Sequence, residues 1–351
     1  MTRILDFLDE EIGRQSFPGA CALVGSTDSI HEIAHAGSAA REPRIAPVTV
    51  DTLFDLASLT KVLCTAALGR RLRDVDIASP PGRFFPGWKR TRYEGITVEM
   101  LWTHTSGLPA WFPLYSRGEG AAAYRKSLSE IEPEARPGER VIYSDLNFLL
   151  LGEILEAAAA APLDRAFAEM IAMPAESSAR FLPPPGTPTA ATEKDDATER
   201  SMTEVRGLSY AHFRSGVVWG EVHDGNAFRR GGVAGNAGLF GTARDVWSLA
   251  RRWLHPDRAD WCMDRTPGLS EARGLAWQGS RGAGSSIGRM SPRAFGHTGF
   301  TGTSVWLDPD ADLIAVLLTN RVHPTVRDAR FNEVRRRFHE IVYDEFSGPR
   351  G

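Results

Sequence analysis

Residues 54–72 read FDLASLTKVLCTAALGRRL, and the interpretation of the whole chain starts from this stretch. It turns helical near Ser58, and its apolar and small residues predict a buried helix. Ser58 and Lys61 stand three residues apart, so a helix places the hydroxyl and the amine on one face. A serine hydroxyl becomes a nucleophile when a neighbouring base takes its proton, and a lysine can be that base if burial lowers its pKa.

An isolated S-x-x-K pattern is not specific, because a capping serine followed by an exposed lysine gives the same spacing. The composition favours the chemical interpretation here. Only four of the 41 basic residues are lysines, and Lys61 lies in an otherwise apolar helix, where an unpaired charge is unfavourable. The N-terminus of the helix would also direct backbone N–H groups toward a developing oxyanion.

A second pattern, Tyr143-Ser144-Asp145, follows Pro137-Gly138 and precedes an apolar helix that starts near Asn147. A tyrosine in such a loop can shuttle a proton if a nearby cation favours its phenolate, and a polar residue two positions on can hold a substrate. Taken alone, the triplet is equally typical of a helix cap with a tyrosine packed in the core.

A third pattern, His297-Thr298-Gly299, lies in GHTGFTGTSVW, residues 296–306, just ahead of a β-prone segment. A glycine at this position lets the backbone of a ligand approach a strand edge closely. Taken alone, the segment also fits a turn into an edge strand with a surface histidine.

In this order, the three patterns resemble the serine β-lactamase and penicillin-recognising family, specifically the class C-like branch that includes esterases and D-peptidases. The resemblance spans about residues 15–345 and includes the strings ITVEMLWTHTSGLP, PGERVIYSDLNFLLLGEILE, GGVAGNAGLF and FGHTGFTGTSVWLDPDADLIAVLLTNR. It implies a largely antiparallel sheet flanked by helices, an all-α insertion, a cleft between them, and neither metal nor organic cofactor. In that cleft Ser58 would be the nucleophile, Lys61 its base partner and Tyr143 the second proton-transfer residue.

The resemblance also implies how substrate is bound. The backbone N–H groups of Ser58 and Phe300 would form the oxyanion hole, and Thr298 and Gly299 would belong to the binding strand. His297 would take the cationic position of the third motif.

Two of these positions depart from the family pattern. The family's Y-x-N is Y-S-D here, and an ionised Asp145 offers only hydrogen-bond acceptors. The family's K-T-G is H-T-G here, and His297, with an ordinary pKa of about 6.5, attracts a carboxylate less than lysine does. If His297 must be protonated to hold an anion, affinity should weaken as the pH rises through its pKa.

These departures favour an acyl-enzyme hydrolase that acts on an ester or a small amide. One alternative is a genuine β-lactamase or a D-Ala-D-Ala carboxypeptidase. Another is a catalytically silent binding protein with the same fold.

The order of predicted elements gives the fold class. A helix over residues 2–15 and two β-prone runs come first, a mainly helical middle follows, and a hairpin around Asp308-Pro309-Asp310 comes near the end. This order predicts an α/β sheet domain from residues 1–80 and 205–351 with a mainly helical insertion over 81–204. We expect the last helix to use one apolar face made of Val326, Phe331, Val334, Phe338 and Ile341.

Inside the insertion, residues 182–200 are rich in proline and predict a surface loop with little buried. With a formal net charge of −3, the chain lacks the excess of positive charge that binding to nucleic acid or to an anionic membrane surface requires. No apolar run approaches the roughly 18–20 residues of a bilayer span. The N-terminus lacks the layout of a signal peptide, so we expect a cytoplasmic protein. The expected partner is a small-molecule ester, amide or peptide-like substrate, and the oligomeric state is open.

Four other patterns in the sequence offer competing interpretations. Residues 284–288 match G-x-S-x-G but lack the flanking strand and helix of a nucleophile elbow. Ser144 could be the serine of an S-D-N motif, although Leu146 would then stand where a polar residue is needed. His104 and the pair His223-Asp224 could be metal ligands, but no second ligand follows at helical spacing, so structural histidines are expected. The GGVAGNAG run lacks the register of a dinucleotide site and predicts a tight turn.

Overall fold

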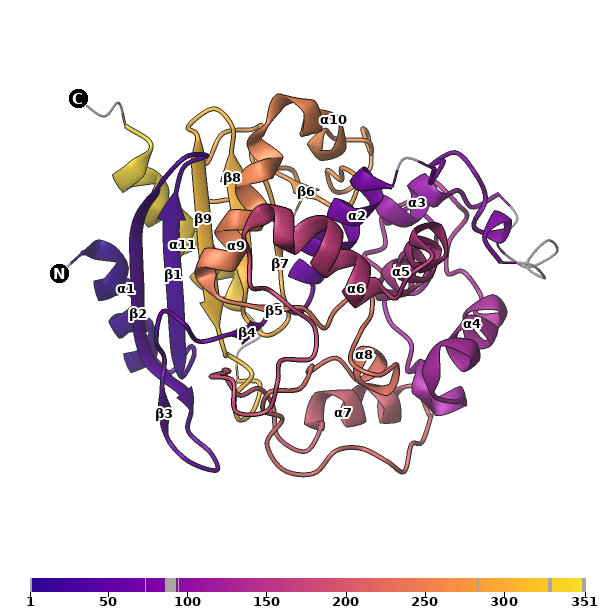
Figure 1. Ribbon diagram of the computed structural model, residues 1–351, viewed down its shortest axis with the longest axis horizontal. Helices are drawn as coiled ribbons and strands as arrows, with labels where there is room; N and C mark the ends of the chain where they lie inside the picture. Colours follow the sequence, from indigo (N-terminus) through magenta and orange to yellow (C-terminus); the bar gives the residue numbers. More distant parts are fainter. Residues whose placement is uncertain are drawn as a thin grey trace.

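An antiparallel sheet of seven strands, in the order β3-β2-β1-β9-β8-β7-β6, forms one part of the protein (Figure 1). The computed structural model describes residues 2–72, 74–85, 93, 95–282, 284–327 and 330–348. The sheet strands are β1 (Gly19–Gly25), β2 (Ile30–Ala40), β3 (Ala46–Pro47), β6 (Gln278–Gly279), β7 (Phe295–Thr298), β8 (Ser304–Asp308) and β9 (Leu313–Thr319). Because β1 pairs with both β2 and β9, segments from the two ends of the chain build one sheet.

The centre of the sheet is buried on both faces, and successive side chains belong to opposite layers. Cys21 and Leu23 of β1 join one apolar cluster, whereas Ala22 and Val24 join the other. This is the period of two that a strand imposes. Helices α1 (Arg3–Gly13) and α11 (Phe331–Phe346) cover the second face (Figure 1).

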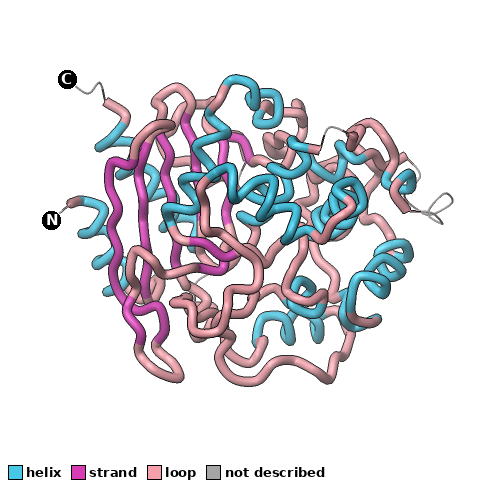
Figure 2. Tube along the Cα trace, viewed as in Figure 1, coloured by secondary structure: helices cyan, strands magenta, loops and turns pink. Residues whose placement is uncertain are grey.

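Helix α9 (Ala243–Ala250) packs on the other face of the sheet. Thr242 and Asp245 form a reciprocal capping box at its start. Most remaining helices gather beyond this face (Figure 2). They are α2 (Ala66–Arg71), α3 (Val98–Trp102), α4 (Gly120–Glu130), α5 (Asp145–Ala159), α6 (Leu163–Phe167), α7 (Ala197–Val205), α8 (Gly225–Arg229) and α10 (Ala259–Cys262).

The predicted antiparallel sheet with flanking helices is confirmed, as are the N-terminal helix and the hairpin around Asp308-Pro309-Asp310, and the two β-prone runs near the N-terminus pair with each other as β1 and β2. The last helix is shorter than predicted. It begins at Phe331, and Val326 lies before it with 38% of its surface exposed, so Val326 does not belong to the apolar face.

The expectation that little of residues 182–200 is buried is wrong for its second half. Residues 189–193 are buried, because their backbone N–H groups bond to neighbouring segments: Ala190 donates to Leu53 O and Ala191 to Ala39 O. Helix α7 then starts at Ala197, inside the predicted loop. Proline restricts the local backbone, but tertiary hydrogen bonds decided burial here.

No single helix in the described ranges is long and apolar enough to cross a membrane. The bent pair formed by α5 and residues 163–175 passes the length and composition test only when the two are taken together across a 72° bend.

Candidate active site

Ser58 lies at a sharp turn between a strand and a helix. The short strand β4 (Phe54–Asp55) pairs with β5 (Phe240–Gly241), and Ala57 then adopts a left-handed conformation with φ of 46°. The Asp55 carboxylate accepts a hydrogen bond from Ala57 N at 2.8 Å and so supports this uncommon backbone geometry. The helix starts at Leu59, one residue after the predicted position, and its turn over Lys61–Thr65 is a π-helix. Such widened turns are frequent at functional sites.

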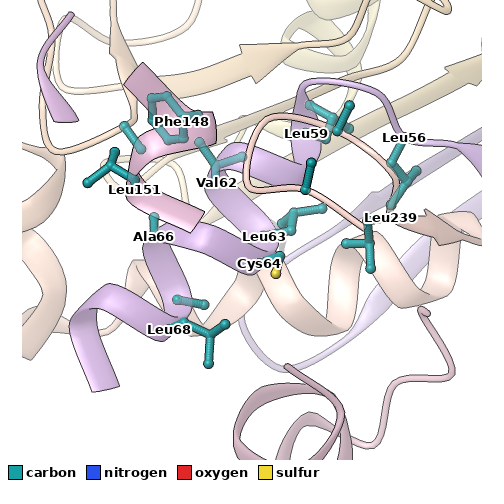
Figure 3. Close-up of a cluster of buried hydrophobic side chains, with 14 of the residues drawn as sticks. Leu56, Leu59, Val62, Leu63, Cys64, Ala66, Leu68, Phe148, Leu151 and Leu239 are labelled. Atoms are coloured by element: carbon teal, nitrogen blue, oxygen red, sulfur yellow. The ribbon is translucent and has the colours of Figure 1, made fainter. Parts of the chain in front are cut away.

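Apolar packing buries the helix that follows Ser58. Figure 3 shows its side chains in one cluster with residues of α5 and of the segment before β5. The members labelled there are Leu56, Leu59, Val62, Leu63, Cys64, Ala66, Leu68, Phe148, Leu151 and Leu239. The helix is thereby fixed against α5, and the side chain of Lys61 is 0% exposed.

A glycine-rich turn, residues 231–238, holds the same helix from another side. Lys61 Nζ donates to Asn236 O at 3.0 Å, and Thr65 Oγ1 donates to Gly235 O at 2.7 Å. A Cβ at Gly235 would lie 2.2 Å from Phe148 O, so only glycine permits this approach to α5. The sequence predicted a tight turn here but did not predict that its carbonyls orient the lysine.

Lys61 contacts Ser58, the candidate nucleophile, and Asp145, the residue that replaces the asparagine of the family's Y-x-N motif. Its Nζ lies 2.8 Å from Ser58 Oγ and 2.6 Å from Asp145 Oδ1. Burial by itself lowers the pKa of Lys61, but Asp145 and Tyr143 together outweigh burial, and the pKa lies above its ordinary value. The condition that burial lowers the pKa of Lys61 is therefore not met in the resting site, where Asp145 of the Y-S-D motif and Tyr143 both act on the lysine.

Tyr143 completes this cluster as a neutral phenol. Burial raises its pKa above the ordinary value, while Lys61 and hydrogen bonding with Ser58 oppose that rise. The Nζ of Lys61 lies 5.2 Å from the centre of the Tyr143 ring. His104 holds the loop in place, since its Nδ1 accepts a hydrogen bond from Ser144 N at 3.0 Å and its ring packs 4.6 Å from the ring of Tyr143.

His297 lies in the same site but is not a cation. It is buried on β7, 5.8 Å from Tyr143 between ring centres, with Nδ1 2.8 Å from Thr298 O. Burial, reinforced by the charges of Lys61 and Arg273, holds the pKa of His297 well below its ordinary value. His297 therefore occupies the family's cationic position without a charge, in line with the expectation that it attracts a carboxylate less than a lysine does.

Ser58 opens into a cavity of about 420 Å³. Thr298, Gly299 and Phe300 line it, and within the described chain neither Ser58 N nor Phe300 N donates a hydrogen bond. Both N–H groups are thus available to a ligand, as an oxyanion hole requires. The remaining residues around the cavity are Ala57, Ala110, Trp111, Tyr143, Asp145, Thr198, Glu199, Met202, His223, Asp224, Ala237, Arg321, Phe331, Asn332 and Arg335.

Sequence analysis missed Glu199 and Arg335, which line the cavity, and Arg273, which lies beside Tyr143. Glu199 fell within the stretch predicted to be an exposed loop, and Arg335 lies on the terminal helix, which was assigned a packing role. Arg273, whose guanidinium lies 5.5 Å from the centre of the Tyr143 ring, is in a segment with no recognisable pattern. The one available signal was His223-Asp224, which sequence analysis singled out only as a possible metal ligand pair.

The competing serines are part of the packing. Ser286 is buried away from the cavity lining and accepts a hydrogen bond from Trp306 Nε1 at 3.1 Å. Ser144 donates from Oγ to Pro109 O at 2.6 Å and is likewise buried.

Among the histidines considered as metal ligands, His223 pairs with a carboxylate, and its Nε2 lies 3.1 Å from Glu193 Oε2. In the described ranges, no group of three or more His, Cys, Asp and Glu side chains is arranged to hold a metal ion.

Comparison with known proteins agrees with this geometry. The sequence model of the family described as Beta-lactamase matches residues 4–339. The chain therefore belongs to the β-lactamase family of serine hydrolases. It is 30% identical over 321 residues to the "Putative D-alanyl-D-alanine carboxypeptidase" of Escherichia coli strain K12, a match that covers 81% of this chain and 72% of that protein.

Two solved structures show the same fold. EstCE1, described as a hydrolase with promiscuous acyltransferase activity, aligns with a TM-score of 0.73 and 19% identity over 96% of this chain and 97% of its own. A class C β-lactamase aligns with a TM-score of 0.73 and 15% identity over 97% of this chain and 96% of its own. The predicted family and the predicted class of enzyme are both confirmed.

Proposed function

We propose that the protein hydrolyses an ester or a small amide through an acyl-enzyme on Ser58. The observation that carries this proposal is the contact of Lys61 Nζ with both Ser58 Oγ, at 2.8 Å, and Asp145, at 2.6 Å, beside the substrate-sized cavity. A buried lysine held against a serine hydroxyl beside free backbone N–H groups is an arrangement for acyl transfer.

The protonation states at rest define what must happen first. Lys61 is an ammonium and Tyr143 a phenol, so neither accepts a proton until the cluster has lost one. In the form that has lost this proton, Ser58 Oγ bonds to the substrate carbonyl carbon and its proton passes to Tyr143 or Lys61. The same proton then goes to the leaving alcohol or amine as its bond to the acyl carbon breaks.

Water reverses these steps in the second half of the cycle. It adds to the acyl carbon, gives a proton to the Tyr143–Lys61 pair, and Ser58 regains a proton as the acid product leaves. The N–H groups of Ser58 and Phe300 would stabilise the oxyanion in both halves. Because the active form has one proton fewer than the resting form, the rate should rise with pH on the alkaline side of neutrality.

A second candidate is D-alanyl-D-alanine carboxypeptidase activity. The name of the Escherichia coli relative suggests it, and Asn332 and Arg335 offer the cavity donors that a terminal carboxylate would require. Release of D-alanine from a peptide ending in D-Ala-D-Ala, measured beside hydrolysis of a p-nitrophenyl ester and of a cephalosporin, separates the candidates. We expect the ester to be the fastest substrate.

Ser58→Ala is the direct test of the proposal. We expect it to reduce ester turnover by roughly 10³-fold or more, because the nucleophile is removed. A fluorophosphonate probe followed by intact-mass measurement should label the wild type once and this variant not at all. Ser286→Ala, which changes the serine of the G-x-S-x-G pattern, is the matched control and should keep both turnover and labelling. Full turnover in Ser58→Ala, or a wild type that takes no label, would refute the proposal.

A further inference from the structure

A buried arginine holds the peptide unit that carries the backbone N–H of Phe300. Arg335 lies on α11 and is 5% exposed, and its Nη2 donates a hydrogen bond to Gly299 O at 2.5 Å. Gly299 O and the N–H of Phe300 belong to the same trans peptide unit, so they point in opposite directions. A donor fixed on the carbonyl oxygen therefore also fixes the direction of the N–H group of Phe300.

The two hydrogen bonds that Arg335 donates in the described structure end on neutral oxygen atoms. Besides Gly299 O, the acceptor is Asn332 Oδ1, which lies 2.8 Å from Nη1. No acidic side chain in the described ranges forms an ion pair with Arg335, so its positive charge acts directly on the carbonyl of Gly299. A cation at a carbonyl oxygen withdraws electron density from the peptide unit and makes its N–H a stronger hydrogen-bond donor.

A second set of contacts holds the same turn against the segment that leads to Ser58. The turn between β7 and β8, residues 299–303, donates two hydrogen bonds to backbone carbonyls of that segment. Thr301 Oγ1 donates to Asp55 O at 2.8 Å, and Thr303 Oγ1 donates to Leu56 O at 3.1 Å. Both threonines are almost completely buried, so water does not compete for these contacts.

The two segments contact each other with no side chain between them. A Cβ at Gly299 would lie 2.8 Å from Leu56 O, so this approach requires glycine. Phe300 follows Gly299, and Ser58 lies two residues after Leu56, so the contacts fix the separation of the two backbone N–H groups of the oxyanion hole. Donors that are already in place need no rearrangement when negative charge develops on the substrate oxygen.

We propose that Arg335 and Thr301 are positioning residues of the oxyanion hole. Arg335 orients and polarises the peptide unit that carries the N–H of Phe300, and Thr301 fixes that unit relative to Ser58. This proposal rests on the proposed function, because it requires the oxyanion that forms when Ser58 attacks a carbonyl. It gives Arg335 a part in the hydrolysis of neutral esters, beyond the binding of a terminal carboxylate.

The first test is Arg335→Met, which keeps an unbranched side chain in the buried position and removes the charge. For the neutral ester p-nitrophenyl butyrate we expect kcat to fall by about tenfold and KM to change by less than about threefold, because the oxyanion hole acts on the transition state. The affinity for phenylboronic acid, which forms a tetrahedral adduct with a serine, should fall by about the same factor. Arg336→Gln, at the exposed next position of the helix, is the matched control and should change none of these values.

A second ester separates positioning from carboxylate binding. Mono-p-nitrophenyl succinate is similar in size to the butyrate ester and carries a carboxylate. If Arg335 acts only by binding a carboxylate, Arg335→Met will raise KM for the succinate ester and leave kcat for the butyrate ester unchanged, and the positioning role of Arg335 is then overturned. A fall in kcat for the butyrate ester supports that role. Because methionine removes a buried charge that no carboxylate in the described ranges pairs with, the melting temperature should not fall.

The second test compares two variants of Thr301. Thr301→Val keeps the shape of the side chain and removes the hydroxyl that donates to Asp55 O, whereas Thr301→Ser keeps the hydroxyl. We expect kcat for the butyrate ester to fall by about tenfold in the valine variant and to stay within about threefold of the wild type in the serine variant, with KM unchanged in both. A valine variant with wild-type kcat, or a serine variant that loses as much as the valine variant, overturns the role of Thr301.

The wild type distinguishes failure of this proposal from failure of the proposed function. A wild type that takes the fluorophosphonate label on Ser58 and hydrolyses the butyrate ester, with Arg335→Met and Thr301→Val both at wild-type kcat, overturns the positioning roles alone. A wild type that hydrolyses neither ester and takes no label overturns the proposed function, and the positioning roles fall with it.

Discussion

Lys61 and His297 are two buried basic side chains in one site, and their charge states differ. Both are almost completely inaccessible to solvent. Lys61 has the Asp145 carboxylate 2.6 Å away and a pKa above its ordinary value. His297 instead contacts the carbonyl of Thr298 through Nδ1, and the Nε2 atom of His297 has no hydrogen-bond partner in the described ranges. The pKa of His297 is well below the ordinary value.

The difference shows that depth of burial does not set the charge in this site. Burial disfavours both cations, and for Lys61 the combined effect of Asp145, at 2.6 Å, and Tyr143 exceeds that of burial. The charged lysine also disfavours a second cation, since Lys61 contributes to lowering the pKa of His297. The two departures from the family pattern are therefore linked: Asp145 keeps Lys61 protonated, and the protonated Lys61 helps keep His297 neutral.

Of the replacements that test this comparison, that of Lys61 should reduce catalytic activity the most. Lys61→Gln removes both the proton-transfer group and the partner of Asp145, so we expect kcat/KM for a p-nitrophenyl ester to fall by about 10²-fold or more. Loss of fluorophosphonate labelling at Ser58 should accompany the fall. Lys126→Gln, at an exposed lysine, should match the wild type. A Lys61→Gln enzyme with more than a tenth of wild-type activity would show that the lysine is not the proton-transfer partner.

Replacement of Asp145 should shift the pH dependence. A raised pKa means that Lys61 gives up its proton only at high pH, so wild-type activity should rise through the alkaline range. Asp145→Asn removes the carboxylate that opposes burial most strongly and leaves only Tyr143 to oppose it, so the pKa of Lys61 should fall. We expect the rising limb of the kcat/KM profile to move to lower pH by about one unit, equivalent to roughly tenfold in rate on that limb.

The control for this shift is Asp28→Asn, at an exposed aspartate, whose profile should overlay that of the wild type. A profile for Asp145→Asn that is unmoved, or that moves to higher pH, would mean that the carboxylate does not hold the lysine in its charged form.

Much of the fold could be predicted from sequence because local patterns and tertiary contacts agree there. The alternation of β1 and the 3.6-residue spacing of α1 match the faces that they bury, and Thr242 caps α9 as a threonine before a helix should. Prediction failed where distant segments decided the outcome. Residues 189–193 are buried because their backbone forms hydrogen bonds with Leu53 and Ala39. These partners are distant in sequence, so no local pattern predicts the contacts.

In the active site, too, the features that depend on local sequence could be predicted and those that depend on distant residues could not. Ser58, Lys61 and Tyr143 could be found because their spacing is a recognisable chemical pattern, and the structure brings the three together. Their charge states could not be found in this way, since they depend on the distance from Lys61 to Asp145, 84 positions later in the chain. Glu199 reaches the cavity from a proline-rich stretch whose local sequence predicted only a surface loop.

The weakest effect is expected at His297, whose charge state decides between two kinds of pH behaviour. A cationic His297 would make binding of an anionic ester weaken as the pH passes its pKa, whereas a neutral one gives no such step. We expect the ratio of KM between His297→Gln and the wild type, for an ester that carries a carboxylate, to stay constant within about threefold from pH 5 to 8. Taking the ratio cancels the titration of other cavity groups such as Glu199. A step in this ratio near pH 6.5 would show that His297 binds the substrate as a cation, and the link between Asp145, Lys61 and His297 would then have to be abandoned.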